Sequence, residues 1–189
     1  MVNTKAVVQT IYYILNKTGQ LDKLKIVKMV YFADKLHLQL FGRTITGDSY
    51  CAMKNGPVGS TTLDVLNENL EYLDENDIEY SKVYLSRLSS DAKIYETSRS
   101  NAELNILSKT DKKVLDQIIE KFAGMDKYEL VEITHRFQEW KQYEEDFKNQ
   151  TRKHADIKIE ELFSQIENDP LGVDPEHLKI TKEFYLGIE

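Results

Sequence analysis

Residues 24–40 read LKIVKMVYFADKLHLQL, and this stretch decides the fold. Placed on a helix at about 100° per residue, its polar side chains fall in one narrow arc. They are Lys25, Lys28, Lys35 and Gln39. Nearly every other side chain is apolar, and a helix that is apolar over most of its circumference lies inside a protein. We therefore predict a buried central helix over about Asp22–Leu40, ended by Gly42.

Asp34 and His37 interrupt the apolar side of this helix. Residues three apart on a helix face each other, so we expect the carboxylate and the imidazole to bond to each other and to hold a neighbouring loop. The same pair is compatible with a catalytic base and its orienting carboxylate, or with half of a metal site. The structural role is the favoured interpretation, because buried polar groups are generally hydrogen-bonded.

The flanking sequence also predicts helices. One covers about Thr4–Lys17 and ends before Gly19. Turn-forming residues crowd the chain between Gly42 and Gly59, which leaves 48–54 as a short extended segment. A helix capped by Ser60 or Thr61 follows and reaches about Leu73, with four leucines as its buried stripe. They are Leu63, Leu66, Leu70 and Leu73.

The second half combines one hairpin with further helices. β-forming residues alternate over 83–97 around a turn at Ser89-Ser90-Asp91, which predicts a β-hairpin. Capping-box patterns at Ser108/Asp111 and Asp126/Glu129 predict helices that reach Phe122 and His135. The remaining expectations are a helix over 137–147, a polar loop over 149–156, a helix over 158–167 and a C-terminal helical stretch over 175–183.

These elements give an α+β fold class that is predominantly α-helical. We expect a compact multi-helix domain around a buried central helix, with a small antiparallel β-hairpin or sheet. With 189 residues and no visible linker, the chain is expected to form a single domain over residues 1–189.

Composition narrows the classes of protein. The chain is 41% hydrophobic and carries a net charge of -7, which disfavours general electrostatic binding to nucleic acid. No apolar run approaches the ~20 residues of a spanning helix, and the N-terminus lacks the features of a secretory signal. We therefore expect a cytoplasmic protein without a membrane partner. The single cysteine excludes an internal disulfide.

Charge is unevenly distributed. Residues 1–60 carry eight Lys/Arg against three Asp/Glu, a balance of +5, whereas residues 61–80 carry seven acids and no base, a balance of -7. We interpret these as two solvated faces, because the bases are too dilute for a nucleic-acid footprint. A DNA-binding regulator would need an exposed stripe formed by Lys23, Lys25, Lys28 and Lys35.

For the remaining cysteine, histidine, tryptophan and glycine–proline positions we predict structural roles. Cys51 is expected to be a small core residue, and His154 and His177 are expected to be exposed. His135 and Trp140 are five residues apart, so on one helix they would point in different directions, with Trp140 packed in the core. The run Asn55-Gly56-Pro57-Val58 predicts a rigid corner, because glycine permits unusual backbone angles and proline fixes φ.

One ordered set of residues extends over about 5–145. It comprises Leu24, Val27, Tyr31-Phe32-Ala33-Asp34, His37, Phe41-Gly42-Arg43, Asp48, Tyr50, Ala52, Gly56-Pro57-Val58, Thr134-His135 and Trp140. The order and spacing of this set resemble the core of the Panacea domain, the family of SocA-like antitoxins of bacterial and phage toxin–antitoxin operons. Residues 146–189 would then be a C-terminal helical extension.

The resemblance implies a largely helical domain that binds a cognate toxin encoded nearby and keeps it inactive, without a cofactor. It implies no catalytic or metal-binding residue and leaves the toxin-binding residues unknown. Its motif positions are expected to be structural or to support an interface. They are Tyr31, Asp34, His37, Gly42, Asp48, Tyr50, Gly56, Pro57, Val58, His135 and Trp140.

Three alternatives stay open at this point. The chain could be an adaptor that delivers a toxin to a cellular protease, as some members of such a family do. It could be a transcriptional regulator that uses the basic N-terminal region. It could also be a metal-dependent enzyme, which requires Asp34, His37 and His135 to meet in a cleft that solvent reaches.

Overall fold

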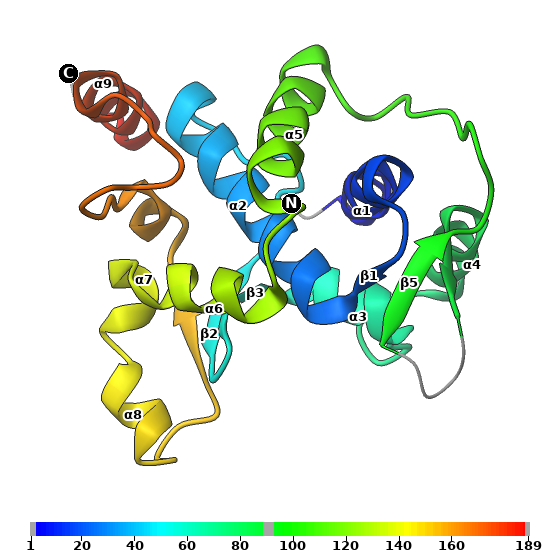
Figure 1. Cartoon of the computed structure of the whole chain (residues 1–189), viewed down its shortest axis with the longest axis horizontal. Coiled ribbons are helices and arrows are strands. Elements are labelled where there is room, and N and C mark those ends of the chain that lie inside the picture. The colour runs from blue at the N-terminus through cyan, green and yellow to red at the C-terminus, as the bar shows by residue number, and fades with distance from the viewer. Residues whose placement is uncertain (1–2, 89–92, 188–189) are drawn as a thin grey trace.

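The fold is built around one helix. The computed structural model describes residues 3–88 and 93–187. At its centre lies α2 (Lys23–Phe41), against which α1 (Thr4–Thr18), α5 (Lys109–Phe122) and α6 (Lys127–His135) pack (Figure 1). The described elements are mainly helices with short antiparallel strands, so the predicted fold class is confirmed.

Both ends of α2 are set by local chemistry. The side chain of Asp22 accepts a hydrogen bond from the Leu24 amide at 2.8 Å and caps the first turn. Gly42 adopts a left-handed conformation at the other end, and its amide donates to the Leu38 carbonyl at 2.9 Å. Every residue from Ile26 to Gln39 is buried, which confirms the predicted central helix.

Three of the four side chains of the polar arc of α2 are buried as well. The side chains of Lys28, Lys35 and Gln39 are 0% exposed, although the first two carry ammonium groups. Lys25 turns its ammonium group to the main-chain oxygens of Ala123 and Met125, at 2.6 and 2.7 Å. The exposed lysine stripe that a DNA-binding regulator would need is therefore not formed.

Glu139, in the short helix α7 (Gln138–Lys141), accepts a hydrogen bond from Lys35 of this arc. The Lys35 ammonium group and the Tyr31 hydroxyl both lie 2.6 Å from its Oε1 atom, and the Ser164 hydroxyl donates to Oε2. Gln39 donates to two main-chain oxygens at the end of the 3₁₀ turn η1 (Ile159–Phe163), at 2.9 and 3.1 Å. These bonds attach the C-terminal third of the chain to α2.

The strands form two small antiparallel sheets. One has the order β3-β2-β6 and joins β2 (Tyr50–Met53) to β3 (Gly56–Gly59) and β6 (His154–Ile157). The other has the order β1-β5-β4, with β1 (Leu21–Asp22), β5 (Ile94–Thr97) and β4 (Leu85–Arg87). The predicted hairpin is confirmed by the pairing of Leu85 with Thr97, while its turn at Ser89-Ser90-Asp91 lies outside the described residues.

Several predicted boundaries are wrong. The helix α3 (Ser60–Asn67) ends early, because Glu68 adopts a left-handed backbone with φ of 52°, and Leu70 is 65% exposed instead of buried. Val83 and Tyr84 end the helix α4 (Glu75–Tyr84) instead of beginning a strand. The capping boxes at Ser108/Asp111 and Asp126/Glu129, by contrast, are both present.

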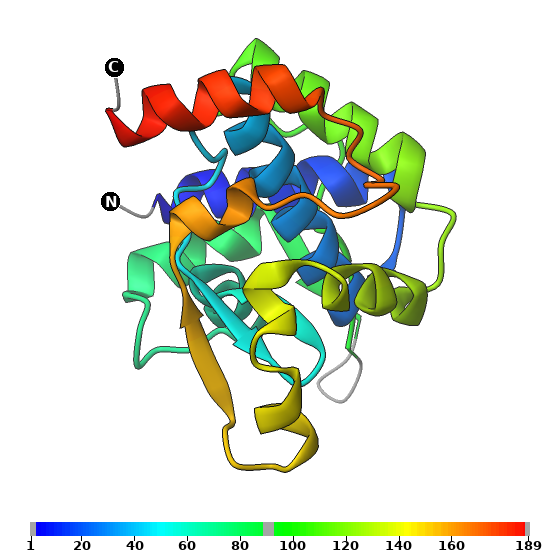
Figure 2. The same ribbon diagram turned by 90° about the vertical axis from the view of Figure 1, so that its left-hand side faces the viewer.

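The last 50 residues differ most from the sequence prediction. The helix predicted over 137–147 is broken into α7 and α8 (Glu144–Lys148), and part of the predicted loop over 149–156 pairs with β2 as the strand β6. The helix predicted over 158–167 is the short turn η1. The C-terminal helix α9 (Pro175–Leu186) lies across α2 and η1 (Figure 2). Within the described ranges, no helix is long and apolar enough to cross a membrane.

The Lys35–Glu139 pair yields a first prediction. We expect Lys35→Met to lower the free energy of unfolding by about 3–5 kcal/mol, because it leaves a buried carboxylate without its counter-charge. The double variant Lys35→Met/Glu139→Gln should be more stable than Lys35→Met alone, since the neutral amide oxygen can still accept from the Tyr31 hydroxyl and the amide NH2 group can donate to the Ser164 hydroxyl. Urea unfolding followed by the fluorescence of the single tryptophan measures both. A double variant that is no more stable than Lys35→Met would contradict this account.

Candidate functional site

Asp34 holds the segment that follows α2. Its Oδ1 accepts from the amides of Ile45 and Thr46 at 2.8 and 3.0 Å, and its Oδ2 accepts from the hydroxyl of Tyr50 at 2.8 Å and from the hydroxyl of Thr46. Burial raises the pKa of Asp34 to about 6, and the hydrogen bonds of Thr46 and Tyr50 oppose this shift. All of these hydrogen-bond donors to Asp34 are groups of this chain.

His37 does not bond to Asp34, so the predicted pairing of these two side chains is wrong. Its Nδ1 atom lies 2.8 Å from the main-chain oxygen of Arg43, and its Nε2 atom lies 3.0 Å from the carboxylate of Asp111 on α5. Burial lowers the pKa of His37. The expected tie to a neighbouring loop is present, but each residue makes it separately.

Asp48 caps the next helix. Its carboxylate accepts from the amides of Thr61 and Thr62, at 2.9 and 2.8 Å, and from the Thr62 hydroxyl at 2.8 Å. The sequence placed a cap at Ser60 or Thr61, but the capping group comes from thirteen residues upstream. A capping carboxylate at this position stabilises the first turn of α3.

Gly56 and Pro57 lie in β3, where the hairpin with β2 crosses α2. The buried ammonium group of Lys28 donates to the Pro57 carbonyl at 2.7 Å. Gly56 has a φ of 96°, and a Cβ atom there would lie 2.8 Å from the Lys28 Nζ atom and would also collide with the Thr134 hydroxyl. The Gly-Pro pair is therefore required by a close approach of three elements: β3, α2 and α6.

His135 and Trp140 lie against the same hairpin. Their rings stack with centroids 3.5 Å apart and planes 4° apart, so the prediction that they point in different directions is wrong. The chain leaves α6 after His135 and begins α7 at Gln138, which removes the single helix that the prediction assumed. The indole of Trp140 is buried and donates to the Met53 carbonyl at 2.7 Å, as the core interpretation predicts.

The three residues proposed for a metal-dependent enzyme do not share partners. Asp34 binds the segment 45–50, His37 binds Arg43 and Asp111, and His135 stacks on Trp140. Burial, and then the Lys28 charge, lower the pKa of His135 to about 4. Across residues 3–88 and 93–187, no group of three or more His, Cys, Asp or Glu side chains is placed to hold a metal ion.

The other cysteine and histidine side chains considered from the sequence show no feature of a reactive group. Cys51 is half-buried in β2, and burial raises the pKa of its thiol, which disfavours a thiolate nucleophile. His154 is exposed on β6, as expected. His177 is also exposed, and its Nε2 atom lies 3.0 Å from the Leu40 carbonyl at the end of α2.

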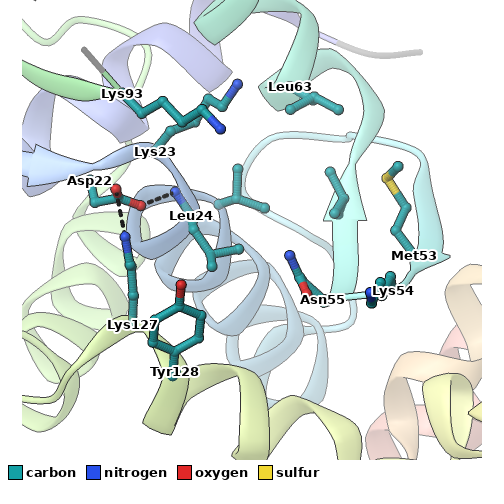
Figure 3. Close-up of a pocket in the computed structure, with 12 residues that line it drawn as sticks. Asp22, Lys23, Leu24, Met53, Lys54, Asn55, Leu63, Lys93, Lys127 and Tyr128 are labelled. Atoms are coloured by element: carbon teal, nitrogen blue, oxygen red, sulfur yellow. Dashed lines mark hydrogen bonds and ion pairs between the residues drawn. The ribbon is translucent and has the colours of Figure 1, made fainter. Parts of the chain in front are cut away.

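A cleft of about 340 Å³ opens beside the N-terminus of α2 (Figure 3). We call it the basic cleft, because four lysines and one acid line it. They are Lys23, Lys54, Lys93, Lys127 and Asp22. Asp22 is already engaged by the ion pair with Lys127, at 2.9 Å, and by its cap of α2. No pattern in the sequence predicted this site, because its lysines lie far apart along the chain.

A comparison with family models decides the classification. The model described as Antitoxin SocA-like, Panacea domain, matches residues 26–141. This chain belongs to the Panacea family. No curated protein and no solved structure matches it.

The Panacea match contains the eleven motif positions from Tyr31 to Trp140, whereas Leu24 of the ordered set lies just before it. It begins inside α2 and ends in α7, and it includes the β2–β3 hairpin, α5 and α6. The helix α1 packs against α2 but lies outside the match, as do β6, η1 and α9. The hydrogen-bonded groups described above therefore belong to the interior of the Panacea domain. Most of the C-terminal quarter of the chain lies outside the matched residues.

Gly56 yields a prediction about this interior. We expect Gly56→Ala to lower the free energy of unfolding by about 1–3 kcal/mol, because the backbone is left-handed and the added methyl group meets Lys28 and Thr134. Gly124→Ala is the matched control, since nothing lies within 4 Å of its Cβ position. It should change stability by no more than about 0.5 kcal/mol. Equal effects of the two substitutions in urea unfolding would contradict the proposed close approach.

Lys28 yields a prediction about pH. Burial lowers its pKa from 10.5 to about 7, so between these values the unfolded chain binds more protons than the folded chain. The free energy of unfolding should therefore rise with pH from about 7 to about 9. In Lys28→Met this rise should be smaller, whereas in Lys17→Met, which removes a half-exposed lysine, it should persist. Urea midpoints across this range test it, and an unchanged slope in Lys28→Met would show that the ammonium group is not the cause.

Proposed function

We propose that this chain is an antitoxin that binds a toxin encoded beside it and neutralises it by direct protein–protein contact in the cytoplasm. Membership of the Panacea family carries the proposal. The internal bonding of the motif supports a binding role over a catalytic one. The carboxylates of Asp34 and Asp48 and the indole of Trp140 are all bonded within the fold, so they act as a frame.

A binding protein needs an exposed surface with apolar side chains, and α9 offers one. Ile180 and Phe184 are 60% and 84% exposed, and they lie four residues apart, on the same side of the helix. Leu186 and the neighbouring Phe41 are also exposed. Exposed apolar clusters of this kind mark protein contact sites. Because α9 lies outside the Panacea match and supplies no hydrogen bond to Asp34, Asp48 or Trp140, we propose it as the toxin contact.

The experiment is co-expression with each adjacent reading frame, scored by growth, by toxin level and by co-purification. Direct neutralisation predicts that one neighbour is toxic alone, and that it becomes harmless while it persists in a complex with this chain. Delivery to a protease would restore growth but deplete the toxin, and blocking proteolysis would restore its level. If no neighbour is toxic, or if growth is rescued without a complex and without depletion, the antitoxin proposal is wrong.

The contact surface has its own test. We expect Ile180→Glu/Phe184→Glu to abolish rescue and co-purification, because two buried carboxylates would oppose the interface. The control variant Val83→Glu/Ile106→Glu adds the same charge at exposed apolar positions elsewhere. Val83 lies in α4, at the right-hand side of Figure 1, whereas α9 lies at the upper left. This control should rescue normally. Circular dichroism must show both variants folded, and full rescue by the α9 variant would contradict this surface.

A further inference from the structure

The basic cleft is an uncompensated positive site in an acidic protein of net charge -7. Within the described residues, the side chains of Lys54 and Lys93 make no hydrogen bond or ion pair. Lys23 donates to the Asn67 side chain at 2.8 Å, which leaves its charge without a carboxylate. Burial lowers the pKa of Lys23, and so do the nearby charges of Lys93 and Arg87. Like charges held this close favour a bound anion.

The residues that line the basic cleft indicate which kind of anion it can bind. Its floor is apolar, made by Leu24, Val27, Val58 and Leu63. Figure 3 shows the lysines spread around the rim, with Lys54 and Lys127 on opposite sides, and Tyr128 at the edge. The first turn of α2 is already capped by Asp22, which would repel a phosphate at that position. Dispersed lysines over an apolar floor fit a peptide segment that combines carboxylates with an apolar side chain.

The same chain carries such a segment. We call residues 68–75, which join α3 to α4 and include the first residue of α4, the acidic loop. Its carboxylates are all exposed: Glu68, Glu71, Asp74 and Glu75. Between them Leu70 and Tyr72 are 65% and 69% exposed, while Leu73 is buried and anchors the loop. The acidic loop therefore presents two apolar side chains among carboxylates.

The acidic loop does not occupy the cleft of its own molecule, since none of its residues lines that cleft. The two features are nevertheless neighbours. Lys23 in the cleft bonds to Asn67, the residue directly before the loop, and Leu63 on the same helix forms part of the cleft floor. A face that carries adjacent complementary features is self-complementary, because a two-fold rotation places each feature opposite its counterpart.

We propose that two copies of this chain associate through this face, with the acidic loop of each molecule bound in the basic cleft of the other. The contact pairs carboxylates with Lys54 and Lys93 and covers Leu70 or Tyr72 with the apolar floor. Two such contacts per dimer double the buried area that one loop supplies. The association is independent of any toxin and leaves α9 free.

Sedimentation of the purified full chain tests the proposal. The 22.0 kDa protein should shift from monomer to dimer as its concentration rises, and raising NaCl from about 0.05 M to about 0.5 M should weaken the dimer about tenfold or more. Lys54→Glu/Lys93→Glu makes the cleft acidic, and Glu68→Lys/Glu71→Lys/Glu75→Lys makes the loop basic, since Asp74 is then its only remaining acid. Each variant alone should remain monomeric, because cleft and loop then carry the same sign.

Mixing the two variants gives the decisive result. In the mixture the acidic loop of the cleft variant meets the unchanged basic cleft of the loop variant, and the basic loop meets the acidic cleft, so a 1:1 heterodimer should form. A wild-type chain that stays monomeric at every concentration, or variants that are folded by circular dichroism but do not pair, would overturn the proposal. So would a dimer that survives both variants, or one lost in Ile180→Glu/Phe184→Glu instead, which would place the contact on α9. None of these outcomes depends on whether the chain neutralises a toxin.

Discussion

Five polar side chains of α2 lie where water does not reach: Lys28, Asp34, Lys35, His37 and Gln39. A buried polar group without a partner costs about 1–3 kcal/mol or more. Each of these groups therefore requires a bond from another element. Lys28 holds the hairpin of β2 and β3, and Asp34 holds the segment before that hairpin. Lys35 holds Glu139 and, through it, Ser164. The arrangement of the other elements follows from these requirements, so α2 is the centre of the fold in energy as well as in position.

Local signals in the sequence predicted the elements that local chemistry determines. The central helix, the capping boxes of α5 and α6 and the hairpin strands were predictable, because their determinants lie within a few residues of each other. The polar arc was visible but its burial was not. Lys35 bonds to Glu139, which lies 104 residues further along the chain. The helical periodicity of a sequence does not distinguish a lysine that meets such a distant partner from a lysine that faces water. The stack of His135 on Trp140 was missed for a related reason, since a break between two helices changed the geometry.

The candidate sites also divide into features that the sequence predicts and features that it does not. Motif residues such as Asp34, Gly56 and Trp140 could be selected from the sequence by their order and spacing, but the sequence did not reveal that their bonds stay inside the fold. The basic cleft could not be predicted, because its lysines come from four separate segments. The same limit applies to α9, whose exposed side depends on how it packs against α2 and η1. We therefore propose that the interior builds the frame of the domain and that the surface binds the partner.

This separation of frame and surface is the central claim, and hydrogen exchange of the chain with and without its toxin tests it most directly. The account predicts that toxin binding slows exchange at the amides of α9, because they become covered and less mobile. Exchange in α2 and in the β2–β3 hairpin should be unchanged. Slowed exchange concentrated in that hairpin, with α9 unaffected, would contradict the account, since it would make the motif itself the contact.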